Sequence, residues 1–211
     1  MPDDVIAIVP AGGRSSRMGP LVGPGGKAAL ELAGETLLER VCRTLAAEVG
    51  RVIVVAAAGQ PVPALPAGVE IVRDRRPSAG PLAAIHDGLV HAGAGPKVAV
   101  VVACDVPGIT PEVIRMLVGA AREPGVRWAV PVVADHPQVL VSALTTELAD
   151  TIAAAVAAGC SSPRLLLADL LRDQPASIRM LAEDHLTLVD PALASFADID
   201  TPGDLPARLR R

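Results

Sequence analysis

A glycine-rich loop with basic side chains follows the first apolar run of the chain, which covers residues 5–9. The loop reads Ala11-Gly12-Gly13-Arg14-Ser15-Ser16-Arg17-Met18-Gly19, and Lys27 comes a little later. Small residues leave backbone N–H groups exposed, and these can surround phosphate oxygens together with the positive end of a helix dipole. Arg14, Arg17 and Lys27 add full positive charges. We predict a triphosphate-binding loop here; a glycine-rich turn that merely ends a strand is the alternative.

This loop matches neither of the two commonest phosphate-binding motifs. A P-loop has Ser or Thr directly after its Gly-Lys pair, but Ala28 follows Gly26-Lys27. The dinucleotide fingerprint G-x-G-x-x-G needs a residue between its first two glycines, whereas Gly12 and Gly13 are adjacent. The missing fingerprint disfavours an NAD-dependent oxidoreductase. Residues 20–26, rich in glycine and proline, form either a loose insertion or a flap that closes over the triphosphate.

A candidate metal ligand, Asp105, follows a second apolar run at residues 98–103. Ligands bind at the carboxyl ends of strands in open α/β sheets, where this side chain is expected to lie. Mg²⁺ is usually held there by one or two carboxylates together with substrate phosphates. A carboxylate that merely caps the following turn is the alternative, but the nearby glycine-rich loop favours the metal.

Two more carboxylates, Asp198 and Asp200, stand close to the end of the sequence. They point to the same face if the segment is extended, because strand side chains alternate. Asp200 could complete a Mg²⁺ shell opposite Asp105, although the choice between Asp198 and Asp200 stays open. Thr201-Pro202 is also typical of an N-cap followed by the first helical position, which leaves the carboxylate of Asp200 available.

Two other loops supply candidate specificity residues. Asp74 could accept hydrogen bonds from guanine N1–H and its N2 amine, a geometry that favours guanine over cytosine or adenine; a solvated loop of mixed charge is the alternative. Arg164 and the serine pair at 161–162 could form part of an acceptor pocket. A helix C-cap at Gly159, with a new N-cap at Ser162, explains most of that segment without function.

The elements that must position these residues alternate between short β-branched runs and longer helical patterns. In the first half they form βαβ-like units, which imply a mostly parallel sheet covered by helices on both faces. A chain of 211 residues is most simply one domain, residues 1–211. We expect strands at residues 5–9, 51–56, 69–72, 98–103, 128–133, 138–144, 186–189 and 196–199, and helices at 36–48, 81–92, 111–121, 145–158 and 163–172.

Composition excludes several classes of partner. The chain is 51% hydrophobic but holds one Trp, one Phe and no Tyr, so it lacks the aromatic platforms of single-strand nucleic-acid binding. A net charge of −4 argues against a general polyanion-binding surface. Three cysteines without a C-x-x-C pattern predict reduced thiols rather than a metal site or disulfides. The absence of a signal-peptide pattern, and apolar runs too short to span a bilayer, predict a cytoplasmic protein without membrane or nucleic-acid partners.

The motif A-G-G-x-S-x-R-M-G with a downstream lysine resembles the nucleotidyltransferases of the MobA-like group, the molybdenum cofactor guanylyltransferases. Further segments match this group in order along nearly the whole chain: Lys27-Ala28-Ala29-Leu30, Gly80-Pro81-Leu82-Ala83, Cys104-Asp105-Val106-Pro107, His136-Pro137, residues 158–164 and Asp200-Thr201-Pro202. The chain departs from the pattern in the seven residues between Gly19 and Lys27, which are more than the family usually has. It also has Asp198 and Asp200 where asparagines are common in the family.

The resemblance implies a three-layer, Rossmann-like nucleotidyltransferase fold with a mostly parallel central sheet. It implies Mg²⁺-dependent transfer of GMP from GTP to a phosphorylated pterin acceptor of the molybdopterin type, with release of pyrophosphate. The expected nucleotide-binding residues are Ala11, Gly12, Gly13, Arg14, Ser15, Ser16, Arg17, Lys27, Asp74, Gly80 and Asp105. The expected catalytic residues are Arg17, Lys27 and Asp105, the metal ligands Asp105 and Asp200, and the acceptor-binding residues His136, Ser161, Arg164 and Asp198.

Two alternatives stay open at this point. One keeps the reaction and changes the substrates: a cytidylyltransferase that acts on molybdopterin or another phosphorylated acceptor. The other is a non-catalytic nucleotide-binding module that regulates a partner. The sequence does not indicate an oligomeric state.

Overall fold

A computed structural model of the chain describes residues 3–12, 18, 23–76 and 79–204. Its centre is a sheet in the order β10-β7-β9-β6-β1-β4-β5, with β8 added beside β7. A separate two-stranded antiparallel ribbon, β2 with β3, precedes the first long helix. The strand bounds are β1 Val5–Pro10, β2 Glu31–Leu32, β3 Glu35–Thr36, β4 Arg51–Ala56, β5 Glu70–Arg73, β6 Val98–Val102, β7 Trp128–Val133, β8 His136–Pro137, β9 Val141–Thr145 and β10 Ile178–Leu181.

Most of the sheet is parallel, as predicted. Strand β1 pairs in parallel with both β4 and β6, and β5 continues this direction beside β4. Strand β9 runs antiparallel to its two neighbours, β6 and β7, whereas β10 is parallel to β7. The carboxyl ends of β1, β4, β5 and β6 therefore lie along one edge, where the loops that carry the predicted site begin.

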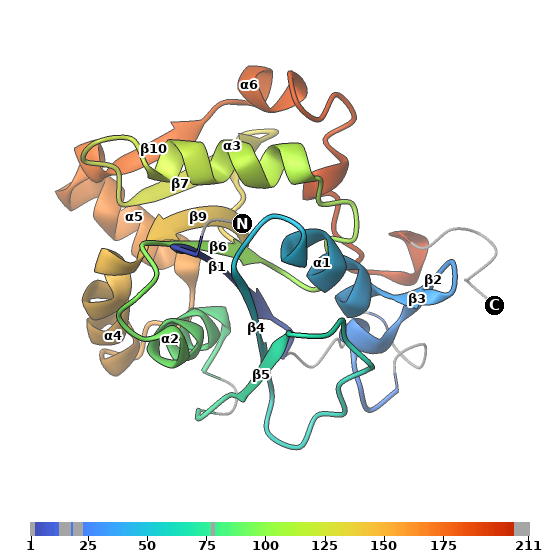
Figure 1. Cartoon of the computed structure of the whole chain (residues 1–211). Coiled ribbons are helices and arrows are strands. Elements are labelled where there is room, and N and C mark those ends of the chain that lie inside the picture. The colour runs from blue at the N-terminus through green and yellow to red at the C-terminus, as the bar shows by residue number, and fades with distance from the viewer. Residues whose placement is uncertain (1–2, 13–17, 19–22, 77–78, 205–211) are drawn as a thin grey trace.

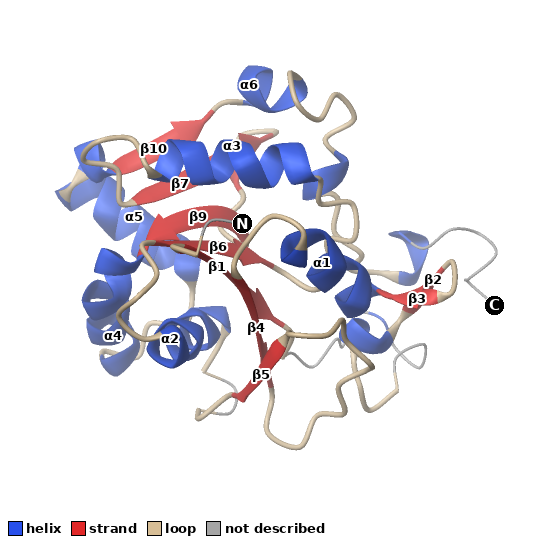
Figure 2. Cartoon of the chain, in the orientation of Figure 1, coloured by secondary structure: helices blue, strands red, loops and turns tan. Residues whose placement is uncertain are grey.

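Helices cover both faces of the sheet (Figures 1 and 2). Buried side chains of α1, α3 and α6 join one core, and those of α2, α4 and α5 join the core on the other face. The α-helix bounds are α1 Leu37–Ala46, α2 Pro81–Ala92, α3 Pro111–Ala121, α4 Ala149–Ala157, α5 Pro163–Asp173 and α6 Glu183–Thr187. Short 3-10 helices cover Lys27–Ala29, Thr146–Leu148, Pro175–Ser177, Ala194–Phe196 and Pro202–Asp204. The three-layer arrangement agrees with the expected fold class, and the single-domain expectation stays a prediction.

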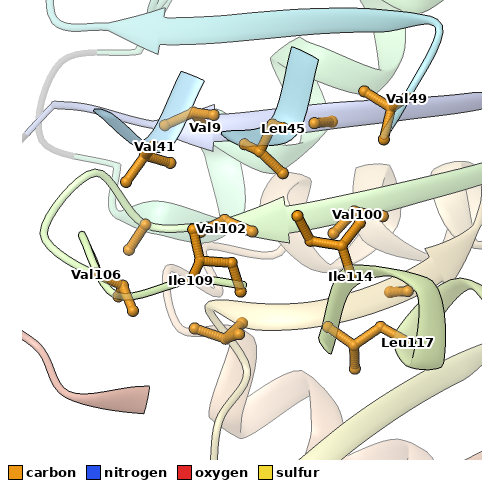
Figure 3. Packing of buried hydrophobic residues seen from close by; sticks show 14 of the residues in the cluster. Val9, Val41, Leu45, Val49, Val100, Val102, Val106, Ile109, Ile114 and Leu117 are labelled. Carbon is orange, nitrogen blue, oxygen red and sulfur yellow. The ribbon is translucent and has the colours of Figure 1, made fainter. Parts of the chain in front are cut away.

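Strand β1 shows how the sequence builds two cores at once. All six of its residues are buried. Val5, Ala7 and Val9 pack in the core of α1 and α3, whereas Ile6 and Ile8 pack in the core of α2. A continuous apolar run serves this purpose because alternate side chains of a strand face opposite sides and both sides are covered. Figure 3 shows the first core, with Val9 of β1 facing side chains of α1 and Val100 of β6 near α3.

Local signals set where several helices begin. The hydroxyl of Thr36 accepts a hydrogen bond from the N–H of Glu39 at 3.2 Å, and α1 starts at the next residue. Thr110 caps α3 in the same way, with Pro111 in the first turn. These capping oxygens satisfy backbone donors that have no partner inside the helix.

The second half departs from the predicted elements. Residues 186–189 are not a strand, since α6 includes the first two of them and Leu186 is its buried contact. Residues 196–199 are not a strand either, because a 3-10 turn ends at Phe196 and the following segment joins no sheet. The strand expected over 138–144 begins at Val141. Strand β10 was not predicted, because its alternating, partly exposed residues give a weak apolar signal.

Three further sequence expectations concern the cysteines, membrane-spanning helices and the segment at Thr201-Pro202. The cysteines at 42, 104 and 160 are free thiols. Among the described helices, none is long and apolar enough to cross a bilayer. The expected N-cap and first helical position at Thr201-Pro202 agree with the 3-10 helix Pro202–Asp204.

Candidate functional site

Three predicted site residues from distant parts of the chain meet at the carboxyl edge of the sheet. Lys27 begins the 3-10 helix before β2, Asp105 follows β6, and Asp200 lies in the C-terminal segment. The Nζ atom of Lys27 donates a hydrogen bond to Asp105 Oδ2 at 3.0 Å, and it also contacts a carboxylate oxygen of Asp200. The lysine side chain is 13% exposed and that of Asp105 is 20% exposed. The site is therefore partly withdrawn from water, which strengthens its electrostatics.

The acidic partners keep Lys27 charged. Burial alone would lower the pKa of Lys27, but the hydrogen bonds to Asp200 and Asp105 outweigh this effect and raise the pKa above its ordinary value. Desolvation raises the pKa of Asp198, and the neighbouring charges of Asp200 and Asp105 add to the shift. Three carboxyl groups, those of Asp105, Asp198 and Asp200, thus act on one another in the region that also holds the ammonium of Lys27.

The acidic pair has the donor chemistry that Mg²⁺ prefers. Among the described residues, no three His, Cys, Asp or Glu side chains form a ready-made metal cluster. Mg²⁺ does not need one, because it is commonly held by one or two carboxylates and by substrate phosphates. Asp105 and Asp200 already converge on one cationic group, the ammonium of Lys27. The residues present therefore fit a divalent cation bound jointly with a triphosphate.

The C-terminal segment is held against the site by specific contacts. The N–H of Ile199 donates to the backbone oxygen of Asp105 at 2.9 Å, and the Ile199 side chain packs with Met18 and Leu37 in a small separate core. The carboxylate of Asp204 accepts from the N–H of Asp200 at 3.0 Å and from that of Thr201 at 2.6 Å. These contacts fix the backbone on both sides of Asp200.

The described part of the predicted phosphate loop lies between β1 and β4. The N–H of Ala11 donates to the Val55 oxygen at 2.9 Å. Gly12 packs closely on Ala57: a Cβ at Gly12 would lie 3.4 Å from the Ala57 nitrogen. The other predicted residues of this loop lie outside the described part of the chain: Gly13, Arg14, Ser15, Ser16 and Arg17.

Sequence reasoning missed Gln60, which joins three segments at this edge. Its Oε1 accepts from the N–H of Ala57 at 3.0 Å. Its Nε2 donates to the oxygens of Ala11 and Gly25, both at 3.0 Å. A lone glutamine in a loop carries no motif, so the sequence held no signal for this role.

Asp74 stands at the end of β5, in a loop anchored by a second missed residue. Its Oδ1 accepts from the N–H of Arg76 at 2.7 Å, so the carboxylate shapes its own turn. Asp87 of α2, 3% exposed, accepts from the N–H of Arg75 at 3.1 Å and from the Arg76 guanidinium at 3.3 Å. The spacing of Asp87 on an otherwise apolar helix face was the available signal, because a buried carboxylate requires partners.

Of the predicted acceptor residues, Ser161 lies against Gly80, which is predicted to bind the nucleotide. Gly80 has φ +83°, and a Cβ there would lie 2.5 Å from the backbone oxygen of Ser161, so glycine permits this close approach. His136 is exposed on β8, and Arg164 is exposed in the first turn of α5. Among the described residues, no hydrogen bond joins either side chain to Lys27, Asp105 or the C-terminal carboxylates. A surface hollow at the carboxyl ends of β7 and β10 is lined by Val132, Ala134, Asp135, Met180, Ala182 and Glu183.

Comparison with known proteins agrees with the motif resemblance. A family model described as the MobA-like NTP transferase domain matches residues 7–176. The chain is 36% identical over 205 residues to a probable molybdenum cofactor guanylyltransferase of Mycobacterium avium, covering 95% of this chain and 92% of that protein. A protein of the same name in Mycobacterium marinum is 35% identical over 208 residues, or 96% and 92% of the two chains.

A solved structure shares the fold. It is that of molybdopterin-guanine dinucleotide biosynthesis protein A from Archaeoglobus fulgidus, with a TM-score of 0.76 and 24% sequence identity. The match covers 97% of this chain and 96% of that chain. The central sheet and its helical layers are therefore common to both proteins.

Proposed function

This chain belongs to the family of MobA-like NTP transferase domains, and we propose that it transfers GMP from GTP to a phosphorylated acceptor of the molybdopterin type, releasing pyrophosphate. The chain is a nucleotidyltransferase by family. The observation that supports the finer proposal is the convergence of Lys27, Asp105 and Asp200. The names of its curated relatives support guanine as the base and a molybdenum cofactor precursor as the acceptor.

The proposed step is an in-line displacement at phosphorus. An oxygen of the acceptor phosphate forms a bond to the α-phosphorus of the triphosphate, while the bond from that phosphorus to the bridging α,β-oxygen breaks. The electron pair leaves with pyrophosphate. Because a phosphate oxygen is already ionised at neutral pH, this displacement requires no general base.

The residues of the site would act by position and charge, which dominate such transfers. Lys27, kept protonated by its acidic partners, would stabilise negative charge on the phosphate chain. Asp105 and Asp200 would hold Mg²⁺, which when bound neutralises phosphate oxygens. We also assign Arg17 and the remaining residues of the glycine-rich loop to the triphosphate.

The remaining substrate contacts are also part of the proposal. Asp74 would recognise guanine from a loop that Asp87 anchors. Ser161, which lies against Gly80, would contribute to the acceptor site, together with His136, Arg164 and Asp198. We propose a cytoplasmic enzyme that works on small phosphorylated substrates.

The test is pyrophosphate release from GTP, CTP, ATP and UTP, each with Mg²⁺ and with molybdopterin present or absent. We expect release with GTP only when molybdopterin is present, and a large loss of turnover in Asp105→Ala. Release with CTP instead would identify a cytidylyltransferase. Triphosphate binding without release for any pair would identify a binding module. Near-normal turnover of Asp105→Ala at saturating Mg²⁺ and GTP would refute the proposed role of this carboxylate.

A further inference from the structure

The side chain of Gln60 uses both ends of its amide to hold backbone groups. Its oxygen accepts from the N–H of Ala57, directly after β4. Its nitrogen donates to the carbonyl of Ala11, directly after β1, and to that of Gly25, two residues before Lys27. One partly buried amide therefore connects the phosphate loop, the β4 loop and the segment that delivers Lys27.

The segment before Lys27 depends on such a connection. Gly25 is buried, and a Cβ there would lie 2.6 Å from the Cβ of Ala29, so the turn packs tightly on itself. The N–H of Gly26 donates to Gly23 at 3.0 Å, and the N–H of Ala29 donates to Gly26 at 3.2 Å. These local bonds shape the turn, but they do not attach it to the sheet. The bond from Gln60 to Gly25 attaches the turn to the loops that follow β1 and β4.

Gln60 is itself held in place from β5. The guanidinium of Arg73 donates to the backbone oxygen of Gln60 at 2.7 Å and to that of Ala57 at 3.2 Å. Arg73 directly precedes Asp74, the proposed guanine contact. The loop of Gln60 thus spans the distance between the proposed base-binding loop and the segment that begins with Lys27.

We propose that Gln60 is a positioning residue for the nucleotidyl transfer, acting by fixing Lys27 relative to the loop after β1. This inference rests on the proposed function. Gln60 contacts backbone groups and needs no contact with a reacting atom. A carboxamide suits the role because it presents one acceptor and two donors in a single plane, matching one N–H and two carbonyl groups.

The first test compares Gln60→Glu with wild type. The glutamate keeps the acceptor for Ala57 but places carboxylate oxygen against two carbonyls. We expect kcat/KM for pyrophosphate release from GTP to fall roughly 10- to 100-fold, the effect of misplacing a charged group by about 1 Å. Gln174→Glu is the matched control, because Gln174 is exposed after α5 and the charge change is the same. It should leave kcat/KM unchanged, and an equal loss in both variants would overturn the proposal.

A double-mutant cycle then distinguishes positioning from general destabilisation. If Gln60 acts through Lys27, Gln60→Glu should add less than about a twofold loss in a Lys27→Met background, because both changes remove the same contribution. If the double variant instead shows the product of the two single-variant losses in kcat/KM, Gln60 does not act through Lys27, and the proposal is overturned. Gln60→Met, which removes both the donors and the acceptor for Ala57 without adding charge, should follow the same pattern.

Hydrogen exchange tests the contact without any activity. The amides of Gly26 and Ala29 should exchange faster in Gln60→Glu than in wild type, whereas the Ala57 amide should stay protected. Unchanged exchange at residues 23–29 would overturn the positioning role. If wild type releases no pyrophosphate, the proposed function fails, while these exchange rates still decide whether Gln60 holds the Lys27 segment.

Discussion

Replacing Lys27 by methionine would remove the ammonium between Asp105 and Asp200 while keeping a long apolar stem. Among the described residues, the charge-assisted contacts to Asp105 and Asp200 are lost in a partly buried setting, and the first of them is a 3.0 Å hydrogen bond. Hydrogen bonds to charged groups contribute roughly 1.5–3 kcal/mol each to the free energy of unfolding. Removing the lysine also removes the cost of burying its charge, which offsets part of this loss. We therefore expect a net loss of about 2 kcal/mol in the free energy of unfolding at low ionic strength. For a chain of this size that loss corresponds to a fall in Tm of roughly 4–8 °C.

The direction of the Mg²⁺ effect makes this prediction specific. With the ammonium gone, the carboxyl groups repel one another and attract a divalent cation more strongly. Added Mg²⁺ should therefore raise the Tm of Lys27→Met more than that of wild type. The assay is urea and thermal unfolding with and without Mg²⁺, followed by fluorescence of Trp128, the single tryptophan, which is 1% exposed.

The matched control is Lys97→Met, which changes the chain's other lysine at an exposed position. It should change neither the unfolding free energy nor the response to Mg²⁺ by more than about 0.5 kcal/mol. If Lys27→Met unfolds like wild type and gains no extra stability from Mg²⁺, the ammonium does not neutralise the acidic pair, and our account of the site's electrostatics is wrong.

Three further outcomes are expected. Ser142→Ala removes the acceptor that lies 3.0 Å from Trp128 Nε1 in the core, and should lower the free energy of unfolding by about 1–3 kcal/mol in urea titrations; a loss below about 0.5 kcal/mol would contradict this. A hydrogen bond from Arg51 lowers the pKa of Glu70 from 4.5 to about 2. The stabilisation that ionised Glu70 gives the folded protein is therefore complete above the pKa of Glu70 in the unfolded chain, 4.5, and is lost as pH falls from there toward 2. The free energy of unfolding of Glu70→Gln should fall less over that range than that of wild type. Equal losses would count against the ion pair of Glu70 with Arg51. Burial raises the pKa of Cys42 to about 12, so Ellman's reagent should label Cys42 in urea but not in the native protein, and rapid native labelling would argue against its burial.

Much of the first half could be predicted from the sequence because its strands carry apolar runs that only a covered sheet can bury. Residues 98–102 are buried throughout, as a central strand of a sheet covered on both faces requires. The convergence of Lys27 with Asp105 followed from a similar rule, since loops after parallel strands meet at one edge. The insertion before Lys27 does not prevent the contact.

The second half of the fold and several site residues depend on tertiary contacts that local sequence patterns do not indicate. The sequence predicts a strand at Leu186, where the structure has a helix, because a short apolar run does not distinguish a strand from one turn of helix. The reversed direction of β9 depends on which neighbours it pairs with, and its own residues do not encode that choice. Gln60 gains its role from backbone groups of other loops, so no local spacing could identify it. For Asp87 the one local signal was a carboxylate on an otherwise apolar helix face, and its partners lie in another loop.

The bond from the Ile199 amide to the Asp105 carbonyl has a consequence for synthesis of the protein. Lys27 and Asp200 are 173 positions apart, so the contact between them cannot form until almost the entire described length has left the ribosome. Closing so long a loop is also slow compared with local folding. A nascent or prematurely terminated chain that stops before Ile199 would contain every strand of the central sheet and still lack Asp200, one of the two carboxylates that contact Lys27.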